Sequence, residues 1–312
     1  VGSEMCIRDR PSSPHGTNRD DTMARRTSVD LLRLNVDLVW GGGERLAGLL
    51  GRPLRDFMVP QGDGTMPVLT IPGFLSGEYN LKRLNRYLTT HGFPAASWGR
   101  GRNLGPRDKT LFEHVEEMEE ELGAAIRDTA QAFEHRVALI GQSLGGVYAR
   151  ELGRRLPDCV DRVITLGSPA MHPERLDELN QFMRYLGRRV TGRRLAELST
   201  QKGSMHWEAD DPPLPYVAVY SPTDRVVPPS LAAIPDEIID RAAPRCPREN
   251  IRIVCSHSGM SVNPFVILAV LDRLVQDHDE WQPFDPGRYF HGAMSHWPTP
   301  YAHHEVGNGA GA

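Results

Sequence analysis

The chain has 312 residues, of which 39% are hydrophobic, and a formal net charge of −4. This length and apolar content suffice for one large α/β domain or two small ones. The slightly acidic balance gives no reason to expect nucleic acid or an anionic membrane as a partner, and no apolar run approaches the roughly 18 residues of a membrane span.

The two ends of the chain are expected to lie outside the folded domain. The first ten residues, "VGSEMCIRDR", resemble a translated sequencing adapter, and residues 11–22 have the composition of disorder, so Met23 is the expected start. Residues 23–60 are interpreted as a helical lead-in. Residues 277–312 are rich in Pro, His and Gly and are interpreted as a poorly ordered tail.

The spacing of the cysteines and the absence of a visible secretory signal indicate in which cellular compartment the protein is expected. Cys159, Cys246 and Cys255 are scattered without a CxxC spacing, which favours neither a disulfide framework nor a zinc site. No secretory signal is visible from residue 1 or from Met23. We therefore expect a cytoplasmic protein.

Between residues 61 and 276, short apolar runs alternate with segments of helical periodicity. Helices are predicted around Leu81–Leu88 and over residues 109–135, 144–156 and 263–276. The predicted strands are "VLTI" (68–71), "PAASWGR" (94–100), "VALI" (137–140), "RVITLGSPA" (162–170), "YVAVYSPTD" (216–224) and "NIRIVCSHS" (250–258). This alternation predicts one α/β domain, a mostly parallel central sheet with helices on both faces.

The segment "VALIGQSLGGVYAR" (137–150) contains the pattern Gly141-Gln142-Ser143-Leu144-Gly145, a GxSxG. Alone this pattern is weak, but here it lies between a predicted strand and a predicted helix. A serine at such a turn has a strained backbone, and Gly141 and Gly145 avoid a clash. The hydroxyl is then exposed at the helix N-terminus, as in a nucleophile elbow. The alternative is a glycine-rich turn that only connects two elements.

A serine nucleophile needs a base and an acid that orients the base. On this fold the chain order is Ser, then Asp or Glu, then His, each after a strand. Asp224 and His257 occupy those places, whereas His206 and His278 follow no strand. Alternatively, Asp224 caps a Pro-Thr-Asp turn and His257 is an ordinary loop histidine.

The oxyanion of acyl transfer needs backbone N–H donors. Leu144, directly after Ser143, supplies one candidate. Phe74 supplies the other, because it follows the first strand in the turn Pro72-Gly73-Phe74, where Gly73 permits a close approach of the backbone. The alternative is an ordinary Pro-Gly turn.

From about Val68 to Gln276 the chain resembles bacterial α/β-hydrolases of the serine esterase/lipase type. The segments that carry the resemblance are "VLTIPGF", "VALIGQSLGGVYAR", "VITLGSPA", "VYSPTDRVVP" and "VCSHSGMSVNP". The resemblance implies Ser143 as nucleophile, Asp224 as acid and His257 as base. Pro72 stands where such lipases commonly carry a histidine.

Residues 171–215 form an insert at the place where this fold commonly holds a cap or lid. An apolar stripe at helical spacing either covers an acyl pocket or packs a surface helix on the core; it comprises Leu176, Leu179, Phe182, Met183 and Leu186. The tail histidines have no acidic or cysteine partner at fixed spacing, so no metal site is expected.

Together these features predict a serine hydrolase that cleaves a small-molecule ester or lipid with an apolar acyl part through an acyl-enzyme. No cofactor or metal is required. Two alternatives remain open: an acyltransferase on the same fold, and a non-catalytic lipid-binding protein.

Overall fold

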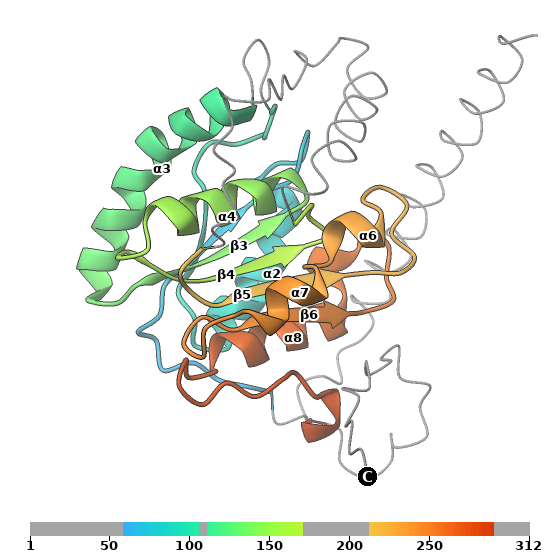
Figure 1. Ribbon diagram of the computed structural model, residues 1–312. Helices are drawn as coiled ribbons and strands as arrows, with labels where there is room; N and C mark the ends of the chain where they lie inside the picture. The colour runs from blue at the N-terminus through green and yellow to red at the C-terminus, as the bar shows by residue number, and fades with distance from the viewer. Residues whose placement is uncertain (1–58, 106–110, 171–211, 290–312) are drawn as a thin grey trace, which may run out of the picture.

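A computed structural model describes residues 59–105, 111–170 and 212–289 (Figure 1). For residues 111 and 112 it describes the backbone only. The predicted segment 1–22, nearly all of the lead-in and most of the insert fall outside the described residues, as do residues 290–312 of the tail.

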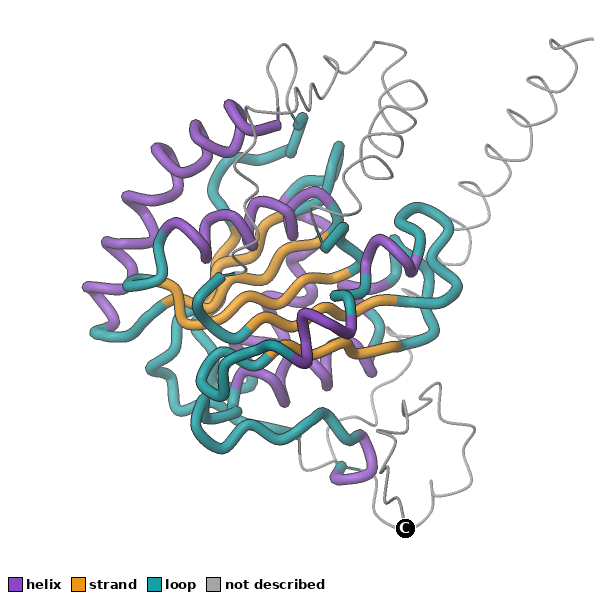
Figure 2. Tube along the Cα trace, viewed as in Figure 1, coloured by secondary structure: helices purple, strands orange, loops and turns teal. Residues whose placement is uncertain are grey.

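Six parallel strands form the centre of the domain, in the order β2-β1-β3-β4-β5-β6 (Figures 1 and 2). Every strand pairing in the described part of the chain is parallel, so the predicted α/β class is confirmed. The strands are β1 (Val68–Ile71), β2 (Ala95–Ser97), β3 (Val137–Gln142), β4 (Val160–Leu166), β5 (Tyr216–Tyr220) and β6 (Arg248–Arg252).

Helices cover both faces of this sheet, as predicted (Figure 1). Two pairs do most of the covering: α3 (Leu111–Phe133) with α4 (Leu144–Arg155) on one face, and α2 (Glu78–Thr90) with α8 (Pro264–Leu274) on the other. The short elements are α6 (Pro229–Ala232), α7 (Asp236–Asp240), η3 (Met260–Val262) and η4 (Pro286–Arg288). No helix among the described residues has the length and apolar character needed to cross a membrane.

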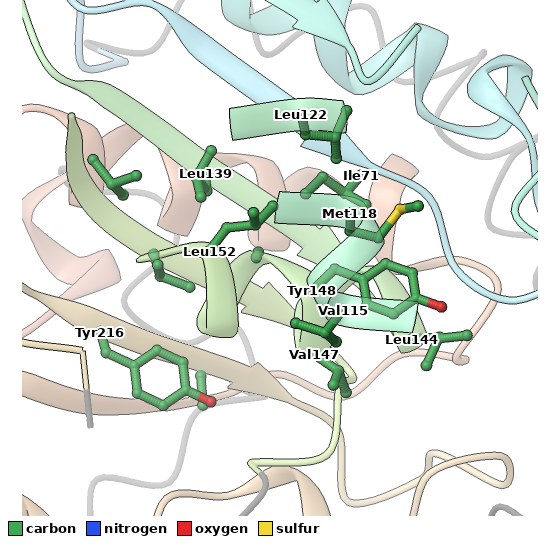
Figure 3. Close-up of a cluster of buried hydrophobic side chains, with 14 of the residues drawn as sticks. Ile71, Val115, Met118, Leu122, Leu139, Leu144, Val147, Tyr148, Leu152 and Tyr216 are labelled. Carbon is green, nitrogen blue, oxygen red and sulfur yellow. The ribbon is translucent and has the colours of Figure 1, made fainter. Parts of the chain in front are cut away.

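Neighbouring residues of a central strand pack into opposite cores. Leu139 of β3 faces the core shared with α3 and α4, and Ile140 faces the core shared with α2 and α8. Figure 3 shows Leu139 in the first of these cores, with Val115 and Met118 of α3. Burial on both faces explains why parallel strands read as continuous apolar runs in the sequence.

Helix α3 buries an apolar stripe, but its last residue lies outside that stripe. Val115, Met118, Leu122 and Ile126 are at most 3% exposed, whereas Phe133 is 40% exposed. Phe133 ends the helix, and the chain turns away at Glu134, which has a positive φ. Phe133 follows these residues at helical spacing in the sequence but does not pack with them.

Residues 277–289 differ from the expected poorly ordered tail, because they pack on the domain. Trp281 Nε1 donates to Glu249 Oε2 at 3.0 Å, and the Phe284 backbone N–H donates to Glu249 Oε1 at 2.7 Å. The guanidinium of Arg273 lies 4.9 Å from the Trp281 ring centroid. Arg273 is fully buried, and buried cations need partners, which this segment helps to supply.

Asp161, at the start of β4, anchors the same segment. Its Oδ2 accepts from Arg162 Nε at 2.5 Å and interacts with His278 Nε2 at 3.2 Å. Burial alone would raise the pKa of Asp161, but the hydrogen bond from His278 and the charge of Arg162 outweigh it and hold this pKa well below its usual value.

We predict that Asp161→Asn destabilises the fold by about 3 kcal/mol at pH 7, because it removes one partner of a buried ionic cluster. The folded-state pKa of Asp161 is lowered, so its stabilisation is complete above the unfolded pKa of about 4 and is lost as pH falls toward the folded pKa. Urea unfolding at pH 7 and pH 3 should show a smaller difference between variant and wild type at pH 3.

The matched control for this experiment is Asp279→Asn. Asp279 pairs with Arg245 on the surface, where both side chains are more than half exposed, and surface pairs contribute little. An Asp161→Asn protein no less stable at pH 7 than the Asp279→Asn protein would contradict the account of this cluster.

Candidate active site

Ser143 lies in a sharp turn between β3 and α4. Its φ of 52° and ψ of −124° place a non-glycine residue in a conformation that L-residues rarely adopt. The turn is fixed on both sides: the Ser143 N–H donates to Leu166 O at 3.0 Å, and the Gly146 N–H donates to Ser143 O at 2.9 Å. This is the strained backbone expected of a nucleophile elbow.

The two glycines of the GxSxG allow this turn to pack tightly. A Cβ on Gly141 would lie 2.3 Å from the Gly145 carbonyl oxygen. A Cβ on Gly145 would lie 2.3 Å from the Ile71 carbonyl oxygen and 2.6 Å from that of Pro72. The elbow therefore contacts the end of β1 through backbone alone, with no room for side chains.

His257 and Asp224 form a hydrogen-bonded pair. His257 Nδ1 lies 2.7 Å from Asp224 Oδ2, and the side chains are 11% and 1% exposed. Asp224 Oδ1 accepts the backbone N–H groups of Val226 at 2.7 Å and Val227 at 2.8 Å. Both carboxylate oxygens thus have donors, and an Nδ1–H bonded to Asp224 leaves Nε2 as the basic nitrogen of a neutral His257.

Two hydroxyl side chains tie the Asp224 loop to the His257 loop. Ser221 Oγ donates to the Cys255 carbonyl at 2.7 Å and accepts the Cys255 N–H at 3.0 Å. Thr223 Oγ1 donates to the same carbonyl at 3.0 Å. Sequence reasoning missed this clamp, because its partners are 32 and 34 residues apart and no local pattern marks it.

Gln142 ties the elbow to the His257 loop. Its Nε2 donates to the His257 carbonyl at 3.0 Å across 115 residues of sequence. Ser143 is the next residue, so this bond brings the serine and the histidine to the same edge of the sheet. Gln142 also escaped sequence reasoning, which treated it as a variable position of the motif.

The loop after β1 lies directly against Ser143. A Cβ on Gly73 would be 3.0 Å from Ser143 Cβ and 3.1 Å from the Gln142 carbonyl oxygen. Ser143 is consequently only 7% exposed, less open than the turn alone predicts. The backbone N–H groups of Phe74 and Leu144 donate to no other residue in the described part of the chain.

Phe74 and Leu144 lie close together beside the elbow. A Cβ on Gly105 would be 3.0 Å from the Phe74 ring and 3.3 Å from Leu144 Cδ2. Leu144 also begins the twelve-residue helix α4, whose N-terminus favours negative charge. The two residues that carry the candidate donors thus lie beside Ser143, at the N-terminus of a helix.

The sheet topology explains why these loops meet. The chain runs from β1 outward to β2 and then returns to β3 on the other side of β1. Crevices at such a switch point, beyond the carboxyl ends of the strands, are where open α/β sheets bind ligands. Phe74 follows β1 and Ser143 follows β3, the two strands that flank this point.

Of the two competing histidines, the one that the structure describes, His278, does not join the site. His278 contacts Asp161 at the start of β4, hence at the opposite edge of the parallel sheet from Ser143, and His206 lies outside the described residues. Across residues 59–289, as far as they are described, no three His, Cys, Asp or Glu side chains are grouped so that they could hold a metal ion.

No protein-family model matches the sequence, and the comparison with curated proteins found no match.

Solved structures resemble the chain only at low identity. A metagenomic alpha/beta hydrolase, MGS-MChE2 from lagoon sediments of Mar Chica, Morocco, is 19% identical over 69% of this chain and 92% of its own, with a TM-score of 0.45. A soluble variant of the Saccharomyces cerevisiae monoglyceride lipase is 14% identical over 70% and 87%, with a TM-score of 0.47. The thioesterase RedJ of Streptomyces coelicolor is 16% identical over 72% and 94%, with a TM-score of 0.45. All three TM-scores lie below 0.5, so the proposed function is based on the geometry of this chain alone.

The tight packing of the elbow can be tested by measuring stability, without an activity assay. Gly145→Ala should lower the free energy of unfolding by about 2–3 kcal/mol, because the new methyl group would overlap the carbonyls of Ile71 and Pro72. Thermal or urea unfolding measures this loss.

Gly77→Ala is the matched control, since a Cβ there meets nothing closer than 3.7 Å. At the N-cap of α2 this change should lower the stability only slightly. Equal stability of the two variants would mean that the elbow does not contact β1 as described.

Proposed function

We propose that the protein is a serine hydrolase that cleaves carboxylic esters with an apolar acyl part. The observation that carries the proposal is the 2.7 Å bond between His257 Nδ1 and Asp224 Oδ2 at the sheet edge that bears the strained turn of Ser143. Ser143, Asp224 and His257 follow one another in the chain order of a Ser-Asp-His triad, which supports these roles.

The first half of the reaction acylates the serine. His257 Nε2 takes the proton of Ser143 Oγ as Oγ attacks the ester carbonyl carbon, and the carbonyl π electrons move to oxygen. The N–H groups of Phe74 and Leu144 stabilise that oxyanion. When the carbonyl re-forms, the bond to the alcohol oxygen breaks and His257 returns the proton to the departing alcohol.

The second half repeats these steps with water. His257 removes a proton from water as the water oxygen attacks the acyl carbon, and the proton then passes to Ser143 Oγ as the acid leaves. Asp224 stabilises the imidazolium formed in both halves. The two backbone donors on Asp224 Oδ1 hold the carboxylate in place for this role.

The apolar acyl part of the proposal is supported by the residues beside the donors. The ring of Phe74 and the side chain of Leu144 lie beside the elbow. Both pack with the core that the sheet shares with α3 and α4. The proposed lid helix within residues 171–215 lies outside the described residues and stays a prediction.

Transfer of the acyl group to an alcohol uses the same residues. The acyl-enzyme is common to both reactions, and only the second nucleophile differs. Adding short alcohols during turnover separates the two, because an acyltransferase would form a new ester in preference to the free acid.

The direct test is hydrolysis of p-nitrophenyl esters from acetate to palmitate. Wild type should turn over, with a preference for acyl chains longer than acetate, because the acyl part packs on apolar side chains. Ser143→Ala should lose at least about 10³-fold in kcat, since it removes the nucleophile.

Ser230→Ala, a change at an exposed serine of α6, is the control and should retain the wild-type rate. Equal turnover by wild type and Ser143→Ala would refute the proposed nucleophile. A folded wild type with no turnover on any ester would refute the proposed activity and favour a binding protein.

A further inference from the structure

A buried asparagine, Asn103, joins the loop after β2 to the loop after β1. It is only 1% exposed. Its Nδ2 donates to the Pro72 carbonyl at 2.7 Å, and its Oδ1 accepts the Gly105 N–H at 3.0 Å. Its backbone carbonyl accepts the Leu75 N–H at 2.7 Å, and its backbone N–H donates to the Ser76 carbonyl at 2.8 Å.

The residues that Asn103 binds in the loop after β1 lie on both sides of Phe74 in the sequence. The side chain of Asn103 holds Pro72, two residues before Phe74, and its backbone holds Leu75 and Ser76, directly after it. A loop held on both sides of one residue leaves little freedom for the peptide between them.

The direction of the Phe74 N–H follows from this arrangement. The Gly73 carbonyl accepts the Ser76 N–H at 3.0 Å, and the described peptide bonds are all trans. In a trans peptide the N–H points opposite to the preceding carbonyl, so the Phe74 N–H points away from Ser76. Rotation of this peptide would turn the N–H away from its present direction.

The loop needs such a tether because its backbone is strained. Leu75 has a φ of 57°, in the left-handed region that favours glycine. Strained backbone persists only where surrounding contacts over-determine it. Asn103 supplies three of those contacts, through Pro72, Leu75 and Ser76.

We propose that Asn103 is a positioning residue that fixes the Phe74 N–H in the direction needed to stabilise the oxyanion. This inference rests on the proposed function. Asn103 acts through Pro72 and the loop after β1, and it is not assigned a contact with the substrate.

The hydrogen-bonding groups around position 103 explain why its side chain is an amide. The position needs a donor toward Pro72 and an acceptor toward Gly105 on one short side chain, which an amide provides. A carboxylate keeps the acceptor but faces the Pro72 carbonyl with a negative charge. An apolar side chain leaves both buried backbone groups without these partners.

The test compares Asn103→Asp with wild type on the preferred p-nitrophenyl ester. We expect kcat to fall by about 10- to 100-fold, because the Phe74 N–H is no longer held in place, while KM changes by less than about 3-fold. A trifluoromethyl ketone with the preferred acyl chain binds Ser143 as an anionic hemiketal. Its Ki should rise by the factor by which kcat/KM falls.

Asn250→Asp is the matched control. Asn250 makes the same kind of paired bond, accepting from the Ile234 N–H at 2.9 Å and donating to the Ile234 carbonyl at 2.7 Å, away from the oxyanion loop. This variant should lose stability but keep the wild-type kcat and Ki. If Asn103→Asp does not fold, Asn103→Ala removes both side-chain bonds without adding a charge and should show the same loss of kcat.

Three outcomes distinguish the two proposals. Loss of kcat with a parallel rise in Ki, in the Asn103 variants alone, supports the positioning role. Wild-type kcat in a folded Asn103 variant overturns that role and leaves the proposed hydrolase intact. A wild type with no turnover refutes the proposed hydrolase, and the role of Asn103 falls with it.

Discussion

The tight turn at Ser143 constrains the rest of the domain. Its positive φ aims a side chain out of the end of a central strand, and the absence of side chains at Gly141 and Gly145 lets the turn contact the end of β1. A Cβ at either glycine would overlap backbone atoms that cannot move without shifting β1 or α4. The position of the serine therefore determines how closely β1, β3 and α4 pack, and the loop after β1 must lie against it.

Long-range hydrogen bonds then complete the site from five loops at one sheet edge. Gln142 holds the His257 loop, Ser221 holds it to the Asp224 loop, and Asn103 holds the loop that carries Phe74. All of these bonds lie beyond the carboxyl ends of parallel strands. A parallel sheet collects such ends on one side, which is how residues far apart in sequence come to share one site.

Much of the fold and the order of the triad candidates follow from local sequence patterns. Parallel strands buried on both faces give continuous apolar runs such as residues 137–140. The helix predicted over residues 263–276 is found as α8, and the side chain of Asn263 at its start accepts from the N–H groups of Phe265 and Val266. Asp224 and His257 could be proposed because each follows a strand in the order that the elbow requires.

Other features could not be read from the sequence, because they depend on contacts between distant residues. Asn103 and Pro72 are 31 residues apart, and Gln142 and His257 are 115 apart. Composition alone suggested disorder for residues 277–289, but Glu249 and Arg273 give Trp281 and Phe284 specific partners. A local sequence pattern cannot reveal that the Arg273 guanidinium is buried and needs these partners.

The central claim is that His257, oriented by Asp224, activates Ser143. The measurement that tests it most directly is mass-spectrometric mapping of a serine-directed phosphonate adduct, with its rate of formation in wild type and in Asp224→Asn. The account predicts an adduct on Ser143 that forms about 10³- to 10⁴-fold more slowly in the variant, because the amide no longer holds the histidine in the tautomer that accepts the proton. An adduct on another serine, or equal rates in the two proteins, would contradict it.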